Sequence, residues 1–587
     1  MAIRGAMGGR SKFAVSLPAD CGCLIDRVSA LVTLAAMKPA TAQRFVRTAM
    51  WFSVAAVLIY WFLWCCFAPV TNGDSRVYNL ARLWLLERDG LFGNFLCLWK
   101  RHLTVPWTFD AAHYPFLYLH RAYAVPSFLC LIGILTATYR MLHRRFGQDA
   151  GLVAVVGLLG MPMLVYQGVT TKNDLVLVFG LIAWFYAFDQ YINDPHRWHL
   201  AMAALAMAIV AGSKTSGLIV GALAVAITPA ISARIIWRRG DAIWFLVSVL
   251  IASFLFSSWE IYLNNRLQFG SWLGDSSDYH TLLNHDGWRG VVANHIRYIF
   301  SSCDLFIVPK AVRIVFGHWK TIVCEGILAK FGLTGAGIAQ LNLHPVSEND
   351  FGRVDAGVYA ETTSTFGLLG FLGIVASIVC LATGRRWDLA RRFAAFSLAS
   401  FTIIVSLGGW HPSGHRYLLV PFVFGFCAMI ATAYSSTRRW PVWALRWIAL
   451  ASIWIVPIVA VSKPIRLLPV AITRPLDLLP PSEAMMRHRL DELAADQRLP
   501  LLLYSGPRAH IFYIFDRLRE SVIPVTRFDE ALFDRLKERY GKNSFPVLIV
   551  NAEVPAGLKE PERIDFLDQG KNINPDEDIL AIWSDAR

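Results

Sequence analysis

The chain has 587 residues, of which 55% are hydrophobic and 17% are charged. Soluble proteins average about 25% charged residues, so this composition excludes an ordinary soluble domain and indicates an integral membrane protein. Lysine and arginine outnumber aspartate and glutamate by 56 to 42, a formal charge of +14, but these cations fall between apolar runs, which points to membrane topology rather than to nucleic acid.

Residues 1–48 are basic and contain no clean signal peptide, so we expect a cytoplasmic N-terminal tail. A transmembrane domain is predicted over 49–462, because this region is a succession of apolar runs close to the ~20 residues that one span needs. About eleven transmembrane helices are predicted, at 49–69, 123–142, 151–168, 175–191, 199–212, 215–233, 242–262, 363–383, 393–409, 417–434 and 441–461.

Arginines in the short loops set the orientation of these spans. Short cytoplasmic loops carry the excess of Lys and Arg. One side holds Lys172, Lys214 and Arg416. The other side holds twelve arginines: 144, 145, 197, 234, 238, 239, 385, 386, 391, 392, 438 and 439. The N-terminus is therefore predicted to be cytoplasmic and the C-terminus extracytoplasmic.

This topology places three long segments outside. The first, 70–122, includes the amphipathic stretch DSRVYNLARLWLLERDG, which is expected to lie on the membrane surface. The second, 263–362, is too long for a bare connection and is expected to contain helices of its own. In the third, 463–587, PLLLYSG, AHIFYIFDRLRE, SVIPVTRF, FDEALFDRLKERYG and FPVLIVN alternate between strand-like and helix-like patterns, which predicts a small extracytoplasmic α/β domain with a parallel sheet.

Polar residues gather at the predicted outer ends of the spans. The candidate site residues are Asp74, Tyr78, Lys172, Asp174, Lys214, Glu361, His415 and Arg416. Taken singly, several have simpler explanations. Lys172 and Lys214 would extend to headgroup water. His411 and His415 would be loop residues, and Asp275 and Asp278 would be turn formers rather than a metal pair.

Taken together, these segments resemble the GT-C superfamily of polyprenyl-phosphate-sugar glycosyltransferases, in the branch that holds the lipid A aminoarabinose transferases and the protein O-mannosyltransferases. The resemblance covers roughly 49–435. The segments that carry it are GDSRVYNLARLWLLERDG, GVTTKNDLVLVFGLIAWFYAFD, AGSKTSGLIVG, SWEIYLNNRLQFGSW, ETTSTFGLLGFLG and HRYLLVPF. One departure is AHYPFLYL, where the aminoarabinose branch has Lys-Pro-Pro, so the donor sugar stays open.

The resemblance implies an inverting sugar transfer on the extracytoplasmic side of the bacterial inner (plasma) membrane. Asp74 is the expected general base, and Asp174 supports it or binds a divalent cation such as Mg or Mn. Arg416 and Lys214 are expected to hold the lipid phosphate, with Tyr78, Lys172, Glu361 and His415 as further substrate-binding residues. The implied partners are a polyprenyl-phosphate sugar, membrane lipids and a glycan, lipid or protein acceptor, with no nucleic acid.

Two other functions fit the same composition. A transporter or flippase of lipid-linked sugars would place functional charges near the middle of the membrane and break its helices there. A membrane-anchored sensor or assembly protein would work through 463–587 and leave the outer acids incidental.

Overall fold

The computed structural model describes residues 39–68, 82–83, 105–119, 122–228, 240–274, 280–303, 310–339, 366–383, 388–459, 468–474, 501–504, 522–525, 530–541, 545–550, 563–566 and 580–586. The chain divides into two units, Met1–Phe52 and Ser53–Arg587. The described part of the first unit is the beginning of helix α2, which starts at Pro39, inside the segment predicted as a tail.

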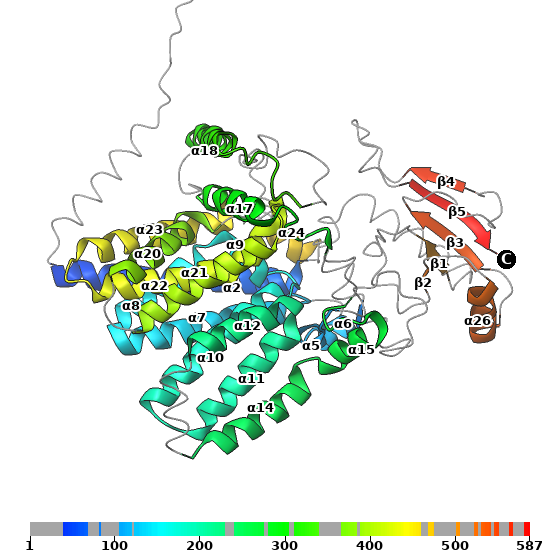
Figure 1. Ribbon diagram of the computed structural model, residues 1–587, viewed down its shortest axis with the longest axis horizontal. Helices are drawn as coiled ribbons and strands as arrows, with labels where there is room; N and C mark the ends of the chain where they lie inside the picture. Colours follow the sequence, from blue (N-terminus) through cyan, green and yellow to red (C-terminus); the bar gives the residue numbers. More distant parts are fainter. Residues whose placement is uncertain are drawn as a thin grey trace, which may run out of the picture. The chain divides into compact units, whose positions relative to one another are not determined.

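Helices make up most of the described chain (Figure 1). They are α2 (Pro39–Phe67), α5 (Thr108–Ala111), α6 (Tyr114–Leu119), α7 (Val125–Phe146), α8 (Gln148–Leu159), α9 (Pro162–Gly168), α10 (Asp174–Asn193), α11 (Arg197–Ser213), α12 (Thr215–Ile227), α14 (Ala242–Phe256), α15 (Trp259–Phe269), α17 (Gly287–Ser302), α18 (Lys310–Lys330), α20 (Gly367–Thr383), α21 (Leu389–Leu407), the 3₁₀ helix η2 (Pro412–Leu418), α22 (Leu419–Ser435), α23 (Trp440–Val459), α24 (Leu468–Thr473) and α26 (Glu530–Tyr540). Helices α17 and α18 lie in 263–362, where helices were expected.

Two groups of helices pack side by side. In one, α10 contacts α11 and α11 contacts α14; in the other, α20, α21 and α22 contact one another (Figure 1). Helix α10 also contacts α7 and α22, which joins the groups. An aromatic cluster fills this junction, because the ring of Phe185 lies 5.7, 5.3 and 5.1 Å from those of Phe393, Phe396 and Phe424. Such aromatic contacts contribute beyond the burial of their area.

The helices support a multi-pass membrane protein, although the number of spans differs from the prediction. Among the described residues, six helices are long and apolar enough to cross a membrane, or eight if two bent pairs each count as one span. The other predicted spans fall on the shorter apolar helices α11, α12 and α20, of 17, 13 and 17 residues. The count of eleven is therefore not confirmed.

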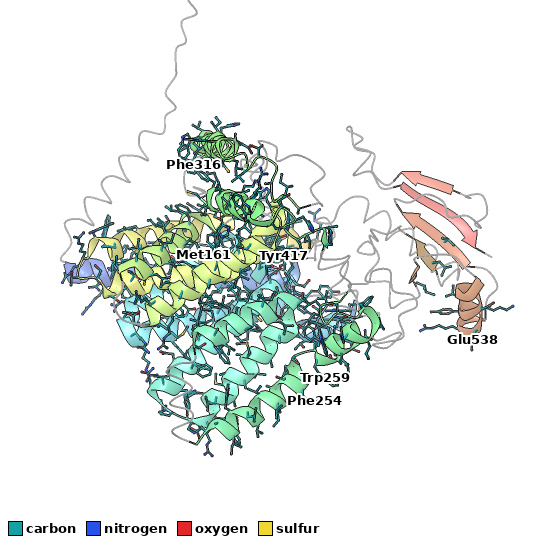
Figure 2. The ribbon with its side chains drawn as sticks, in the orientation of Figure 1. Met161, Phe254, Trp259, Phe316, Tyr417 and Glu538 are labelled. Carbon is teal, nitrogen blue, oxygen red and sulfur yellow. The ribbon has the colours of Figure 1, made fainter. Side chains whose placement is uncertain are left out.

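Each bend coincides with an identifiable backbone feature. Helices α8 and α9 meet at 77°, where Pro162 at the start of α9 lacks the N–H that a continuous helix needs. Helices α14 and α15 meet at 65° around Ser258, which takes a left-handed backbone conformation with φ 52°. Phe254 and Trp259 stack across this second break, with ring centroids 5.7 Å apart (Figure 2).

The C-terminal part contains a five-stranded sheet in the order β2-β1-β3-β5-β4, formed by β1 (Leu501–Tyr504), β2 (Val522–Val525), β3 (Phe545–Val550), β4 (Arg563–Phe566) and β5 (Leu580–Ala586). Strands β2, β1 and β3 are parallel and coincide with the three predicted strands. Strands β4 and β5, which were not predicted, run antiparallel, so the sheet is mixed. The second predicted helix is α26, and the first lies outside the described residues.

Candidate functional site

Five of the eight predicted site residues belong to the described part of the chain, namely Lys172, Asp174, Lys214, His415 and Arg416. Asp74, Tyr78 and Glu361 lie outside it, as do Asp275 and Asp278.

Asp174 is the first residue of α10, and its side chain is only 6% exposed. The preceding residue, Asn173, donates through Nδ2 to the carbonyl of Ser213 at 2.7 Å, which ties the start of α10 to the end of α11. Lys172 is also buried, with 1% exposure. The expectation that Lys172 extends to headgroup water is therefore wrong, because its side chain is covered by the protein.

Lys214 joins α11 to α12 in an extended conformation, with φ −163° and ψ 147°. Its Nζ lies 2.5 Å from Oδ1 of Asp174, so this lysine is paired instead of extending to water. Gly212 explains the close packing at this end of α11: a Cβ there would lie 2.0 Å from the carbonyl oxygen of Phe256 and 2.5 Å from Oγ1 of Thr108. A larger residue at 212 would push the α11 end, and Lys214 with it, away from its neighbours.

Tyr417 connects the two predicted phosphate ligands. The Nζ of Lys214 lies 4.3 Å from the centre of its ring. The guanidinium of Arg416 lies 4.9 Å from the same ring and donates to its hydroxyl at 2.9 Å. Both are within the ~6 Å range of cation–π attraction. Figure 2 shows Tyr417 within the helical part of the molecule.

Arg416 and Lys172 also act electrostatically on the Asp174 carboxylate. One acid is therefore paired with Lys214 and lies within electrostatic range of two further cations, so that the three cations come from the start of α10, the α11–α12 junction and η2. The structure brings together four of the predicted residues: Lys172, Asp174, Lys214 and Arg416.

The segment before η2 is held between two other pieces of chain. The backbone of 408–410 forms bridges to Leu283 on one side and to Ile338 on the other. Asn294 of α17 also donates to the carbonyl of Gly408 at 3.0 Å. These backbone hydrogen bonds fix the direction in which the chain enters η2, and so they position Arg416 and Tyr417.

His415 faces away from this cluster and toward α17. Its Nε2 lies 2.7 Å from Oγ of Ser301, and its ring meets that of Tyr298 edge-on at 5.6 Å. Gly414 allows this contact, because a Cβ there would lie 2.1 Å from the Tyr298 hydroxyl oxygen. Both His411 and His415 are buried, so neither is the plain loop residue expected. The contacts of His415 tie η2 to α17.

His411 is a neutral member of the cluster. Burial, together with the positive charges of Arg416, His415 and Lys214, lowers the pKa of its imidazole to about 3. Its ring lies 5.8 Å from that of Tyr417. It therefore adds a polar group and no charge at neutral pH.

The sequence reasoning missed two features near this site. Arg82 and Asp110 form an ion pair in which both side chains are 2% exposed, and Arg82 also donates to the carbonyl of Pro106 at 3.1 Å. Ser258 accepts hydrogen bonds through Oγ from the backbone N–H groups of Trp107 and Thr108 at 3.1 and 3.2 Å. Hydrophobic periodicity predicts neither contact, because both join residues that lie far apart in the chain.

The residues around Asp174 do not fit a divalent cation. Mg²⁺ and Mn²⁺ prefer several oxygen ligands, whereas this carboxylate is ion-paired with Lys214 and lies within electrostatic range of two further cations. In the described ranges, no group of three or more His, Cys, Asp or Glu side chains could hold a metal ion.

Residues 101–262 match the family model described as dolichyl-phosphate-mannose-protein mannosyltransferase. Over this segment the chain resembles the GT-C glycosyltransferases. The match supports the prediction of a membrane glycosyltransferase with a lipid-linked donor. It includes Lys172, Asp174 and Lys214 and ends before Arg416.

Among solved structures, the chain is similar to the crystal structure of ArnT from Cupriavidus metallidurans bound to undecaprenyl phosphate, with 13% identity, a TM-score of 0.47, and coverage of 91% of this chain and 97% of that one. The apo state of the same protein gives 14% identity, a TM-score of 0.44, and coverage of 93% and 98%. No curated protein sequence matches the chain.

Proposed function

We propose that the chain is an inverting glycosyltransferase that moves a sugar from a polyprenyl-phosphate donor to an acceptor hydroxyl at the extracytoplasmic face of the membrane. The observation that carries this proposal is the convergence of Asp174, Lys214 and Arg416 from three separate helix ends. The family match over 101–262 supports the reaction class.

The cations of the cluster suit the leaving phosphate. Arg416 can present two N–H donors to two phosphate oxygens, and Lys214 adds a second positive charge. Tyr417 already holds both of them in place. Charge that is positioned before the reaction stabilises the developing negative charge on the leaving group without reorganisation.

The proposed reaction breaks one bond and forms another. The acceptor oxygen attacks the anomeric carbon from the face opposite the phosphate, so the configuration inverts. The bond between the anomeric carbon and the phosphate oxygen breaks, and polyprenyl phosphate leaves. The proton of the acceptor hydroxyl passes to a carboxylate as the new bond forms.

Asp174 is a poor candidate for that carboxylate, because an acid that already binds an ammonium group accepts a proton less readily. We therefore assign Asp174 to holding Lys214 in position for the phosphate. Asp74 follows the first predicted span in the sequence, and we propose it as the general base.

The proposed orientation places the N-terminus in the cytoplasm and the cluster, 263–362 and 463–587 outside an inner (plasma) membrane. In support, Arg144 and Arg145 end α7, and Arg438 and Arg439 follow α22, at helix ends remote from the cluster. The positive-inside rule assigns that side to the cytoplasm.

One observation favours the transporter as a second candidate. Transporters commonly break their helices within the membrane, and this chain has two bent pairs, α8–α9 and α14–α15. The charged residues of the cluster, however, belong to the ends of α10 and α11 and to η2, and to neither bent pair.

The test is release of polyprenyl phosphate. Purified wild-type protein is mixed with bacterial polyprenyl-phosphate sugars and a membrane extract that supplies acceptors, with and without EDTA. We expect free polyprenyl phosphate and a glycosylated product, both unaffected by EDTA and both lost in Asp74→Asn. Movement of lipid-linked sugar across proteoliposomes with no release would establish the transporter instead, and equal release by wild type and Asp74→Asn would exclude Asp74 as the base.

A further inference from the structure

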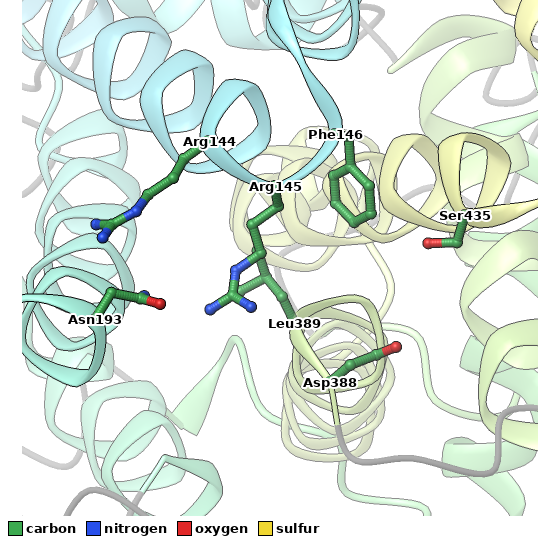
Figure 3. Close-up of a pocket in the computed structure, with 7 residues that line it drawn as sticks. All are labelled: Arg144, Arg145, Phe146, Asn193, Asp388, Leu389 and Ser435. Carbon is green, nitrogen blue, oxygen red and sulfur yellow. The ribbon is translucent and has the colours of Figure 1, made fainter.

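A polar pocket lies at the other end of the helices that form the candidate site. It has a volume of about 370 Å³, within the usual range of ligand pockets. Its lining residues are Arg144, Arg145, Phe146, Asn193, Asp388, Leu389 and Ser435 (Figure 3). They belong to the ends of α7, α10 and α22 and to the start of α21.

The helix lengths separate this pocket from the candidate site by about one membrane thickness. Helix α10 begins at Asp174 and ends at Asn193 after 20 residues, which is about 30 Å at 1.5 Å per residue. Helix α22 likewise follows Arg416 and ends at Ser435. The pocket is therefore at the depth where the headgroups of the opposite leaflet lie.

The arginines of the pocket are only partly neutralised. Arg145 pairs with Asp189, which is 3% exposed. Arg144 donates to the side-chain oxygen of Gln190 at 2.9 Å, a neutral partner that leaves its charge uncompensated there. Figure 3 shows Arg145 reaching between Asn193 and Asp388.

Further groups suit a phosphate and the rest of a lipid headgroup. Asn193 donates one amide N–H to the carbonyl of Asp189 and has a second N–H to offer a ligand. The Ser435 hydroxyl donates to the carbonyl of Ala431 at 2.7 Å and can accept a hydrogen bond, while Phe146 and Leu389 supply apolar walls. Arg392 lies within electrostatic range of Arg145 and Asp388 and adds positive charge. The one acid of the lining, Asp388, accepts a hydrogen bond from the backbone N–H of Arg391 at 3.0 Å and so caps α21.

Arginines at the last turn of a helix also compensate its macrodipole, so Arg144 and Arg145 have a purely structural explanation. That explanation does not require an open pocket where four helix ends, two arginines and an amide donor meet. Basic pockets between membrane helices on the cytoplasmic side are suited to phosphorylated lipid headgroups.

We propose that this pocket binds the phosphate group of an anionic phospholipid headgroup, on the side of the membrane opposite the candidate site. The proposal does not depend on the glycosyltransferase activity. It makes two opposite predictions for two lining residues. Removing the Arg144 cation weakens binding, and removing the Asp388 charge strengthens it.

The experiment titrates purified full-length protein in detergent with phosphatidylglycerol, phosphatidylcholine and inorganic phosphate, and counts bound molecules by native mass spectrometry. We expect saturable binding of phosphatidylglycerol. Arg144→Gln should weaken it about fivefold, the effect of one basic residue at an anionic surface. Asp388→Asn should tighten it severalfold, because the substitution removes a negative charge from the lining of the pocket. Helix α21 should stay intact, because Asn caps helices as well as Asp does. The matched control is Arg140→Gln, an exposed arginine one turn earlier on α7 that does not line the pocket.

Each outcome decides the proposal. Competition by inorganic phosphate would show that the site recognises the phosphate alone, and binding of phosphatidylglycerol without such competition would show that the whole headgroup is needed; both support a phosphate site. Equal affinity for phosphatidylcholine and phosphatidylglycerol would overturn it. So would equal weakening by Arg140→Gln and Arg144→Gln, or weakening by Asp388→Asn, since these results fit general surface charge or a structural role.

Discussion

Tyr417 is the residue on which the geometry of the candidate site depends most. Its ring lies beneath the Lys214 ammonium, and its hydroxyl accepts from Arg416. The sequence predicted the two cations from their places at span ends, but the aromatic group between them follows only from the way that η2 meets the α11–α12 junction.

Tyr417→Phe tests this positioning. The variant keeps the ring beneath Lys214 and removes the acceptor for Arg416, so we expect the donor KM to rise about threefold to tenfold, the value of one hydrogen bond, with kcat little changed. Steady-state kinetics with a polyprenyl-phosphate sugar measures both. Tyr434→Phe is the matched control, because Tyr434 lies near the far end of α22, the helix that follows η2, and bonds Asp149 instead. A fall in kcat alone would contradict a positioning role.

Asp174→Asn tests the acid of the cluster. Loss of the carboxylate releases Lys214 from its pair, and we expect the transfer rate to fall on the order of 100-fold. Asp189→Asn removes a similarly buried, arginine-paired carboxylate at the other end of α10. The melting temperature should fall in both variants, but the activity only in Asp174→Asn. A comparable loss of activity in the two variants would show that Asp174 acts through the stability of the fold and not through the donor site.

His411 predicts a pH dependence of stability. Its pKa of about 3 in the folded protein lies below the value of about 6.5 for a free histidine, so the unfolded chain binds the additional proton. Stability is then complete above about pH 6.5 and is lost as the pH falls, on the order of 1 kcal/mol per pH unit. Melting curves from pH 7 to 5 should show a smaller decrease for His411→Gln than for wild type. Equal decreases would contradict this assignment.

At the scale of secondary-structure elements, the apolar runs predicted where helices lie but not where they break. Periodicity and length place 151–168 and 242–262 as single spans, whereas each is divided into two helices. Pro162 was a visible signal for the first break. The second depends on Ser258, whose left-handed conformation is held by contacts with Trp107 and Thr108 about 150 residues earlier in the chain, and no local pattern reports such contacts.

Ser258→Ala tests the second break. The substitution leaves two backbone N–H groups at the start of α5 without their side-chain acceptor, which costs about 1–3 kcal/mol of folding free energy. The melting temperature in detergent should fall by several degrees. Ser248→Ala is the control, because Ser248 is partly buried on α14 and bonds only the carbonyl of Trp244 in its own helix. A result in which Ser248→Ala destabilises as much as Ser258→Ala would argue against the break as a structural joint.

At the scale of the whole molecule, composition and arginine distribution predicted a multi-pass membrane protein, and the family match supports the GT-C resemblance. The order of the motifs along the chain was enough for this resemblance, since each motif lies beside a predicted span. The convergence of α10, the α11–α12 junction and η2 on one acid required the structure, because helix packing decides which span ends become neighbours.

The central claim is that Arg416 and Lys214 form the binding site for the donor phosphate, and donor affinity in Arg416→Gln tests it most directly. Wild type, Arg416→Gln and the exposed control Arg438→Gln are titrated with a polyprenyl-phosphate sugar in detergent, and Kd is measured for each. We predict at least a tenfold rise in Kd for Arg416→Gln, since a hydrogen bond to a charged group contributes about 1.5–3 kcal/mol, and no change for Arg438→Gln. An unchanged Kd in a folded Arg416→Gln protein would contradict the claim.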